Sequence, residues 1–175
     1  DFGHSGYIDN IASKQMNAED AWGTCLLLKR RRMKLTKNFT LEELCVTDTG
    51  LPNVPEPHVV DRLLLVAFYL LQPTRDRYGA LKVNSGFRSL AVNHKIGGSG
   101  TSQHLRGEAV DIKPLESDIR EVYAWMRDSL IYGQIIFEDK DGSQWIHVSL
   151  PRTSGKNMMA GIFDGLEYLW TNPGV

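Results

Sequence analysis

The chain has 175 residues, of which 42% are hydrophobic and 23% are charged, and its formal net charge at pH 7 is -1. This length and composition fit one soluble globular domain with a sizeable core and leave little room for a second. A nearly neutral chain has no long-range field that would attract nucleic acid, so we expect no nucleic-acid partner. The two cysteines are too few for a disulfide framework or a thiolate zinc cage. Any bound metal must therefore use histidine and carboxylate ligands.

The apolar segments are too short to cross a membrane. Leu63 to Leu71, for example, is far below the roughly 20 residues that a spanning helix needs. The N-terminus also lacks the charged-then-apolar pattern of a signal peptide. We therefore expect no membrane span, and the sequence does not indicate a route of export.

Residues 1–32 differ in character from the rest of the chain. They mix glycines with a basic run, Lys29 to Arg32, which we interpret as a solvated or disordered segment. We predict that residues 1–32 are an N-terminal appendage of unknown role: an arm, a pro-segment, an upstream extension, or a stretch without function. Residues 33–175 are predicted to form the main domain.

The first half of that domain contains one strong helix signal. A Thr-x-x-Glu capping box at Thr40 to Glu43 predicts a short helix, and the proline-rich stretch 48–57 predicts a loop. Apolar residues recur at helical spacing from His58 to Gln72, and we expect Pro73 to end this helix.

The second half of the domain contains several segments in which apolar and polar residues alternate as they do in strands. The glycines at 97, 98 and 100 predict that residues 86–101 lack regular structure, and residues 117–130 predict a capped amphipathic helix. Strands are predicted at 82–85, 108–112, 134–138 and 144–149, and the turn sequence 139–143 joins the last two into an antiparallel hairpin. We therefore predict an α+β fold in which a small antiparallel sheet carries the metal ligands and packs against helices that include 58–72 and 117–130.

Three residues have the chemistry of a zinc site: His104, Asp111 and His147. Two imidazoles and one carboxylate leave the fourth tetrahedral position open for water, as in catalytic sites. Seven residues of straight strand would hold His104 and Asp111 roughly 23 Å apart, so the chain must reverse between them. Gly107 can supply the reversal because it tolerates positive φ. The trio taken alone is a weak signal, since histidines are more often structural, and His4, His58 and His94 are not expected to bind metal.

The surrounding motifs strengthen this hypothesis. They are Ser85-Gly-Phe-Arg88-Ser89, Asn93 with Gly97-Gly98-Ser99, Ser102-Gln-His104-Leu-Arg-Gly107-Glu-Ala-Val-Asp111-Ile, Gln134-Ile-Ile-Phe-Glu138 and Trp145-Ile-His147-Val-Ser149. In this order, over roughly residues 35–150, they resemble the zinc D-Ala-D-Ala carboxypeptidase and L-alanyl-D-glutamate endopeptidase superfamily, peptidase family M15. The likeness is greatest to its phage-type branch, and the superfamily shares its fold with the Hedgehog signalling domain.

The resemblance implies roles for individual residues. His104, Asp111 and His147 would bind one Zn²⁺, and Arg88 would hold substrate near the scissile bond, where a guanidinium can stabilise developing charge. The alternative for Arg88 is a structural ion pair. Ser102 and Gln103 are candidates either for substrate binding or for fixing the loop that carries His104.

The general base departs from the pattern of many relatives. They carry an acidic residue three positions before the last histidine, where this chain has Gln144. The predicted hairpin places Glu138 opposite Gln144 or Trp145, near the face that carries His147, so Glu138 is the candidate catalytic base. Asp139 and Asp141 are interpreted as turn residues.

These features predict a zinc metallopeptidase that hydrolyses a peptide bond in the stem peptides of bacterial peptidoglycan, acting in the cell wall or periplasm as a monomer. It could be a DD-carboxypeptidase, an endopeptidase or a phage endolysin, and the sequence does not identify the bond that is cut. The alternative is a Hedgehog-like binding or structural module that keeps zinc for stability without hydrolysis. An ionisable residue facing the open metal position would distinguish the two.

Overall fold

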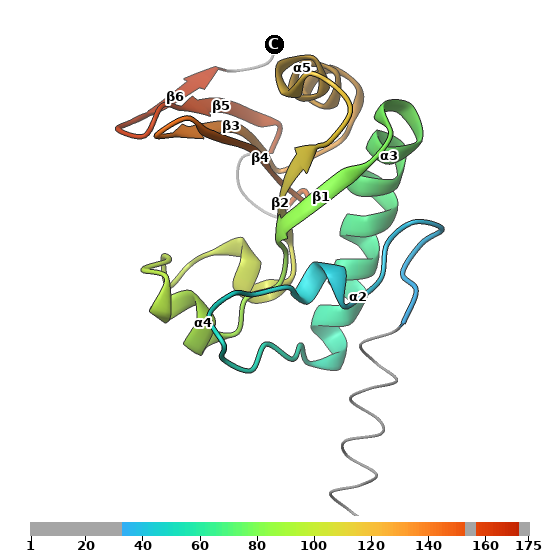
Figure 1. Cartoon of the computed structure of the whole chain (residues 1–175), viewed down its shortest axis with the longest axis vertical. Coiled ribbons are helices and arrows are strands. Elements are labelled where there is room, and N and C mark those ends of the chain that lie inside the picture. The colour runs from blue at the N-terminus through green and yellow to red at the C-terminus, as the bar shows by residue number, and fades with distance from the viewer. Residues whose placement is uncertain (1–32, 153–156, 172–175) are drawn as a thin grey trace, which may run out of the picture.

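A six-stranded sheet organises the part of the chain that the structure, a computed structural model, describes: residues 33–152 and 157–171. Its strand order is β1-β2-β4-β3-β5-β6, and every neighbouring pair is antiparallel except β3 and β5 (Figure 1). The α+β fold is thereby confirmed, with two further strands extending the predicted antiparallel sheet. The strands are β1 (Leu81–Ser85), β2 (Ala109–Pro114), β3 (Gln134–Lys140), β4 (Ser143–Ser149), β5 (Met159–Phe163) and β6 (Tyr168–Thr171).

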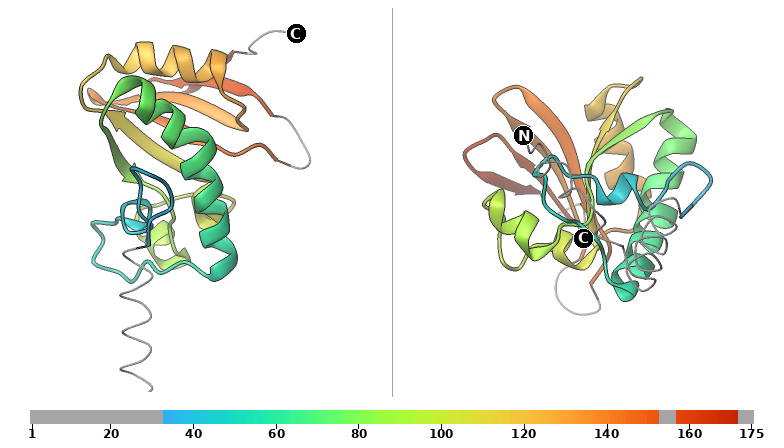
Figure 2. Two further views of the ribbon diagram at one scale, coloured as in Figure 1. Left: turned by 90° about the vertical axis from the view of Figure 1, so that its right-hand side faces the viewer. Right: turned by 60° about the horizontal axis from the view of Figure 1, so that its bottom comes forward.

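Helices cover one face of this sheet. Helix α5 (Ile119–Ser129) and the long helix that contains α2 (Pro57–Val66) pack there, as Figure 2 shows. The core includes fully buried apolar side chains from the helices and the sheet, among them Leu63, Val66, Ile112, Val122, Met126, Ile135 and Ile146. The opposite face of the sheet is therefore the one available for a site.

None of the described helices is both long and apolar enough to traverse a bilayer.

The predicted end of the long helix at Pro73 is wrong. Helix α2 continues through a π-helical segment, η2 (Ala67–Leu71), into α3 (Gln72–Tyr78). The N–H of Gln72 donates to the carbonyl of Ala67, five residues back instead of four. This wider turn places Pro73 in the first turn of α3, where the N–H that proline lacks is not needed for a helical hydrogen bond.

A short helix also lies inside the glycine-rich stretch where no regular structure was predicted. Helix α4 (Leu90–Lys95) begins after Ser89, whose hydroxyl accepts a 3.4 Å hydrogen bond from the N–H of Val92. The N–H of Gly98 donates to the carbonyl of Asn93 after the helix ends. The glycines therefore end a helix that a serine cap begins, and the prediction is wrong because it took account of the glycines alone.

Two predicted helix starts are confirmed with small shifts. The capping box of Thr40 forms reciprocally, since its N–H donates to the Glu43 carboxylate at 2.7 Å, and the helix it starts is the 3-10 turn η1 (Glu43–Cys45). Helix α5 begins one residue after Asp118, whose carboxylate accepts from two backbone N–H groups.

The β3–β4 hairpin has the predicted register. Its turn residues Asp141 and Gly142 have φ of 52° and 78°, the left-handed values of a tight Asp-Gly hairpin turn. Glu138 consequently lies opposite Trp145. Asp141 is thus a turn residue as predicted, whereas Asp139 lies in β3 opposite Gln144 and supports the turn by accepting a hydrogen bond from the N–H of Gly142.

Gly107 makes the reversal between His104 and Asp111. It follows the 3-10 helix η3 (Gln103–Arg106) with φ of 65° and leads directly into β2. A Cβ atom at this position would lie 2.7 Å from Cγ1 of Val59 and 3.0 Å from its carbonyl oxygen. Both the backbone conformation and the close packing against α2 therefore require glycine.

We predict that Gly107→Ala lowers the free energy of unfolding by about 1–3 kcal/mol, the usual cost of holding a non-glycine residue in a rare backbone conformation. Chemical denaturation measures it. Gly100→Ala is the matched control in the preceding loop, because a Cβ there meets nothing within 4 Å. Equal losses in the two variants would contradict the role given to Gly107.

Candidate metal centre

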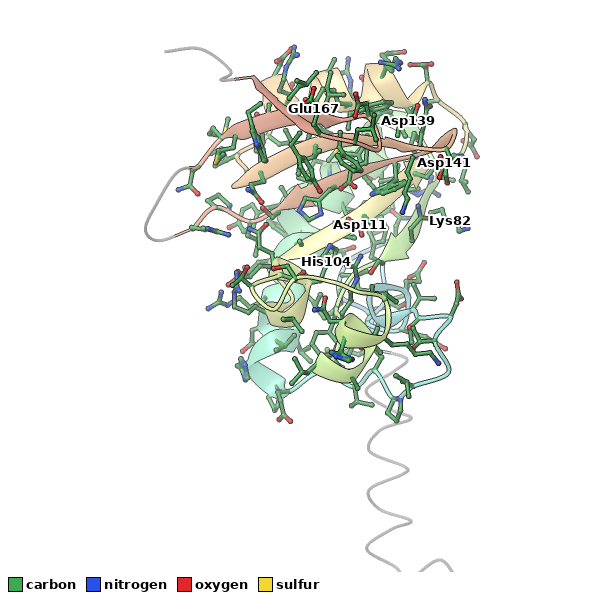
Figure 3. The ribbon with its side chains drawn as sticks, turned by 90° about the vertical axis from the view of Figure 1, so that its left-hand side faces the viewer. Lys82, His104, Asp111, Asp139, Asp141 and Glu167 are labelled. Atoms are coloured by element: carbon green, nitrogen blue, oxygen red, sulfur yellow. The ribbon has the colours of Figure 1, made fainter. Side chains whose placement is uncertain are left out.

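Three elements bring the predicted ligands together. His104 lies on η3, while Asp111 on β2 pairs directly with His147 on β4. Asp111 Oδ1 is 3.3 Å from His104 Nε2 and 2.9 Å from His147 Nδ1. All three side chains are buried, and Figure 3 shows His104 and Asp111 next to each other on the open side of the sheet. The strand register and the Gly107 turn thus assemble residues that are up to 43 positions apart in sequence.

This arrangement fits a zinc ion. One possible donor atom from each residue lies within 4.8 Å of the others. Ligand atoms at 2.0–2.2 Å from a tetrahedral zinc are about 3.4 Å apart, close to the spacings found here. His104 Nδ1 is 2.7 Å from the carbonyl oxygen of Gly86, which assigns the proton to Nδ1 and leaves Nε2 free to coordinate.

The charge on Asp111 is held by its neighbours. Burial alone would raise the pKa of this carboxyl, but the adjacent His104 and His147 hold the pKa of Asp111 well below its usual range. Asp111 is therefore ionised at neutral pH, as a metal ligand must be.

Arg88 approaches the same carboxylate from the other side. Its Nη2 donates to Asp111 Oδ2 at 2.6 Å and its Nε donates to the Ser85 hydroxyl at 2.7 Å. The structural ion pair considered for Arg88 is thus present. The guanidinium also lines the cavity over the metal group, so substrate contact by Arg88 stays a prediction.

Glu138 lies on the same face of the sheet as His147. Ile136 pairs with His147 and Glu138 pairs with Trp145, so Glu138 and His147 are diagonal neighbours on adjacent strands. Burial raises the pKa of Glu138, the charge of Asp111 raises it further, and a hydrogen bond from the Trp145 side chain opposes them. Glu138 lines the same cavity as the three candidate ligands, and its role as a proton acceptor stays a prediction.

Gln144 and the two aspartates of the hairpin lie away from the metal group. Gln144 alternates to the face opposite His147, where its amide donates to Asp139 Oδ2 at 2.5 Å. Figure 3 shows Asp139 and Asp141 at the far end of the hairpin from His104. In this register, position 144 does not face the metal group whichever residue it holds.

Ser102 and Gln103 both line the cavity, and both are already hydrogen bonded. The Ser102 hydroxyl accepts from the N–H of His104, and the buried Gln103 amide donates to the hydroxyl of Ser149 at 2.9 Å. These contacts favour the loop-fixing alternative for the pair. Their binding of substrate stays a prediction.

The cavity over the metal group has a volume of about 490 Å³ and includes residues that the sequence analysis missed. Two of them, Tyr168 and Trp170, come from β6, whose strand was not predicted at all. The signal that could have revealed it is the short run Tyr168-Leu-Trp-Thr171, rich in residues that favour strands, which follows the turn at Gly165. The other lining residues to which the sequence analysis gave no role in the site are Ser99, Thr101, Gln134, Ile136, Trp145 and Arg152.

The two other histidines among the described residues lie outside the metal group. His58 is exposed near the start of α2, and His94 is exposed on α4, in a helix instead of the predicted loop. His4 lies outside the described residues, as do the basic run and the rest of the predicted appendage at 1–32.

Comparison with known proteins agrees with this geometry. A search of curated proteins finds no match to the chain. The sequence model of the family described as Peptidase M15 matches residues 37–149, which contain all three candidate ligands, Arg88 and Glu138. M15 peptidases are zinc-dependent and act on peptidoglycan peptides. Because the match covers more than half of the chain and runs through the whole metal group, this protein belongs to the peptidase M15 family.

Proposed function

We propose that the protein is a zinc peptidase that hydrolyses a peptide bond in the stem peptides of bacterial peptidoglycan, in the cell wall. The observation that carries this proposal is the buried His104, Asp111 and His147 group with Glu138 on the same face of the sheet. Two imidazoles and one carboxylate leave an open zinc position, and Glu138 is the ionisable residue that faces it.

The residues divide the reaction among them. A zinc ion held by the three ligands would lower the pKa of a coordinated water towards 7 and polarise the scissile carbonyl. Glu138 accepts the proton as the water oxygen bonds to the carbonyl carbon. When the C–N bond breaks, Glu138 passes this proton to the leaving amine. Arg88 donates hydrogen bonds to the substrate near the oxygen where negative charge develops.

The Hedgehog-like alternative, a zinc module without hydrolysis, lacks an observation in its favour. Its distinguishing feature would be an open metal position without a proton acceptor, whereas Glu138 occupies that surface here. The zinc-loaded protein, incubated with purified peptidoglycan, is expected to release fragments whose masses identify the cut bond and separate carboxypeptidase from endopeptidase action. A fully zinc-loaded protein that releases no fragment would instead support the alternative.

We predict that His104→Ala, Asp111→Ala and His147→Ala each abolish stoichiometric zinc binding, because two protein ligands compete poorly with water. Elemental analysis of the purified variants measures the zinc content. His58→Ala is the control, since His58 is exposed on α2, and it should keep one zinc per chain. Zinc retention in all three ligand variants would refute the assignment.

Glu138→Gln should keep the fold and the zinc while losing about 10²- to 10⁴-fold in kcat, the usual contribution of general acid-base catalysis. The amide has nearly the same shape as the carboxylate but cannot accept the proton. Release of peptidoglycan fragments over time gives the rate. Asp141→Asn, at the hairpin turn, should leave the rate unchanged, and a Glu138→Gln enzyme as fast as the parent would exclude Glu138 as the base.

Arg88→Ala should have two effects, because Arg88 both orients Asp111 and faces the cavity. Zinc affinity should fall by about 10- to 100-fold, as when groups that hold a metal ligand are removed. At saturating zinc, kcat/KM should still be lowered, and Arg88→Lys should restore it only in part because lysine lacks the planar fork. Full activity of Arg88→Ala at saturating zinc would reduce its role to positioning Asp111.

A further inference from the structure

The cavity extends from the metal group across the sheet to two aromatic rings on its edge strand. His147 pairs with Ile136, Ile136 with Gly161, and Gly161 with Trp170, so one cross-strand row joins the metal group to β6. Three steps of about 4.8 Å between strands put Trp170 roughly 14 Å from His147 along this row. An extended peptide covers that distance in about four residues. A ligand longer than the cleaved peptide unit can therefore occupy the metal group and β6 at once.

The rings on β6 are held in place although they are partly exposed. Tyr168 stacks on Phe163 with ring centroids 4.5 Å apart, and on Trp170 at 5.8 Å with an interplanar angle of 15°. Trp170 also packs closely over Gly161, where an added Cβ would lie 3.0 Å from the indole. Tyr168 and Trp170 nevertheless remain 48% and 45% exposed. Exposed aromatic side chains that are already ordered lose little entropy when a ligand packs on them.

Apart from the metal group, Arg88, Glu138 and Arg152, the polar side chains that line the cavity are uncharged. Ser99, Thr101 and Gln134 line it together with the two rings. The hydroxyls of Ser99 and Thr101 are 3.0 Å apart, and the Gln134 side chain offers an amide. Flat aromatic surfaces beside hydroxyl and amide groups suit a neutral ligand that has an apolar face and a rim of hydrogen-bonding groups. A pyranose ring that bears an acetamido group has this chemistry.

We propose that Tyr168 and Trp170 form a saccharide subsite, which binds an N-acetylated sugar of the glycan strand while its attached stem peptide lies at the metal group. This inference rests on the proposed function, because it assigns the sugar to the same peptidoglycan substrate. It makes the enzyme selective for stem peptides that are still joined to glycan.

The first experiment compares cleavage of two substrates by the zinc-loaded full chain: a stem pentapeptide joined to its disaccharide, and the same pentapeptide without sugar. The parent should show a kcat/KM about 3- to 10-fold higher on the disaccharide-bearing substrate, the scale of one aromatic stacking contact. Trp170→Ala should bring this ratio close to one by slowing that substrate alone. Trp170→Phe, which keeps a stacking face, should retain part of the preference.

Leu169→Ala is the matched control, since Leu169 lies between the two rings on the same strand, is 53% exposed and points to the other face. It should keep the parent ratio. A ratio unaffected by Trp170→Ala would overturn the proposal. Equal slowing of both substrates by Trp170→Ala would also overturn it, by assigning the rings to the peptide.

A second measurement separates failure of this inference from failure of the peptidase assignment. Calorimetric titration with chitotriose, a peptide-free trimer of N-acetylglucosamine, should detect binding that Trp170→Ala weakens at least several-fold and Leu169→Ala does not. Binding of this kind in a protein that cleaves neither substrate would support the saccharide subsite while refuting the peptidase. Cleavage of both substrates at equal kcat/KM without chitotriose binding would do the reverse.

Discussion

The buried negative charge of Asp111 is the constraint around which this site is built. A carboxylate with 7% of its surface exposed is costly unless charged and hydrogen-bonding groups surround it. Here His104 and His147 approach one oxygen and Arg88 approaches the other. The same contacts hold one nitrogen of each imidazole at nearly the distance from the carboxylate oxygen that two ligands of a tetrahedral metal require. The network that stabilises the buried carboxylate therefore also orients it as a metal ligand.

This constraint extends to residues that contribute no side chain to the metal group. His104 reaches Asp111 only because Gly107 reverses the chain, and its ring is oriented by the carbonyl of Gly86. Gly86 itself packs against η1, where an added Cβ would lie 2.2 Å from the Leu44 carbonyl oxygen. The backbone on both sides of the ring is thus fixed by close packing, which is how a ligand on a short 3-10 turn can be placed as firmly as one on a strand.

The parts of the fold that could be predicted from sequence are those with local causes. The Asp141-Gly142 turn sets the hairpin register, and that register alone puts Glu138 on the face of His147 and Gln144 on the other. The His104, Asp111 and His147 trio by itself is a weak signal for a metal site. The neighbouring motifs, which follow one another in the order of the M15 family, strengthen that signal. The continuation of the helix through Pro73 could not be predicted in this way, because it depends on a π-helical turn that periodicity does not reveal.

Strands β5 and β6 show the limit of local reasoning most clearly. β5 joins the sheet by a parallel pairing with β3. In the sequence the two strands are separated by β4 and the connection after it, so no short turn between them sets this pairing. The pairing nevertheless shapes the cavity: without β5 the sheet would end at β3, and the row that begins at the metal ligands would stop at Ile136, two strands short of Trp170 on β6. Because Gly161 has no side chain, the indole of Trp170 can pack directly over the backbone of β5 at this position. A side chain larger than glycine at this position would raise the ring away from β5, so the floor of the cavity depends on a residue that contributes no side chain to it.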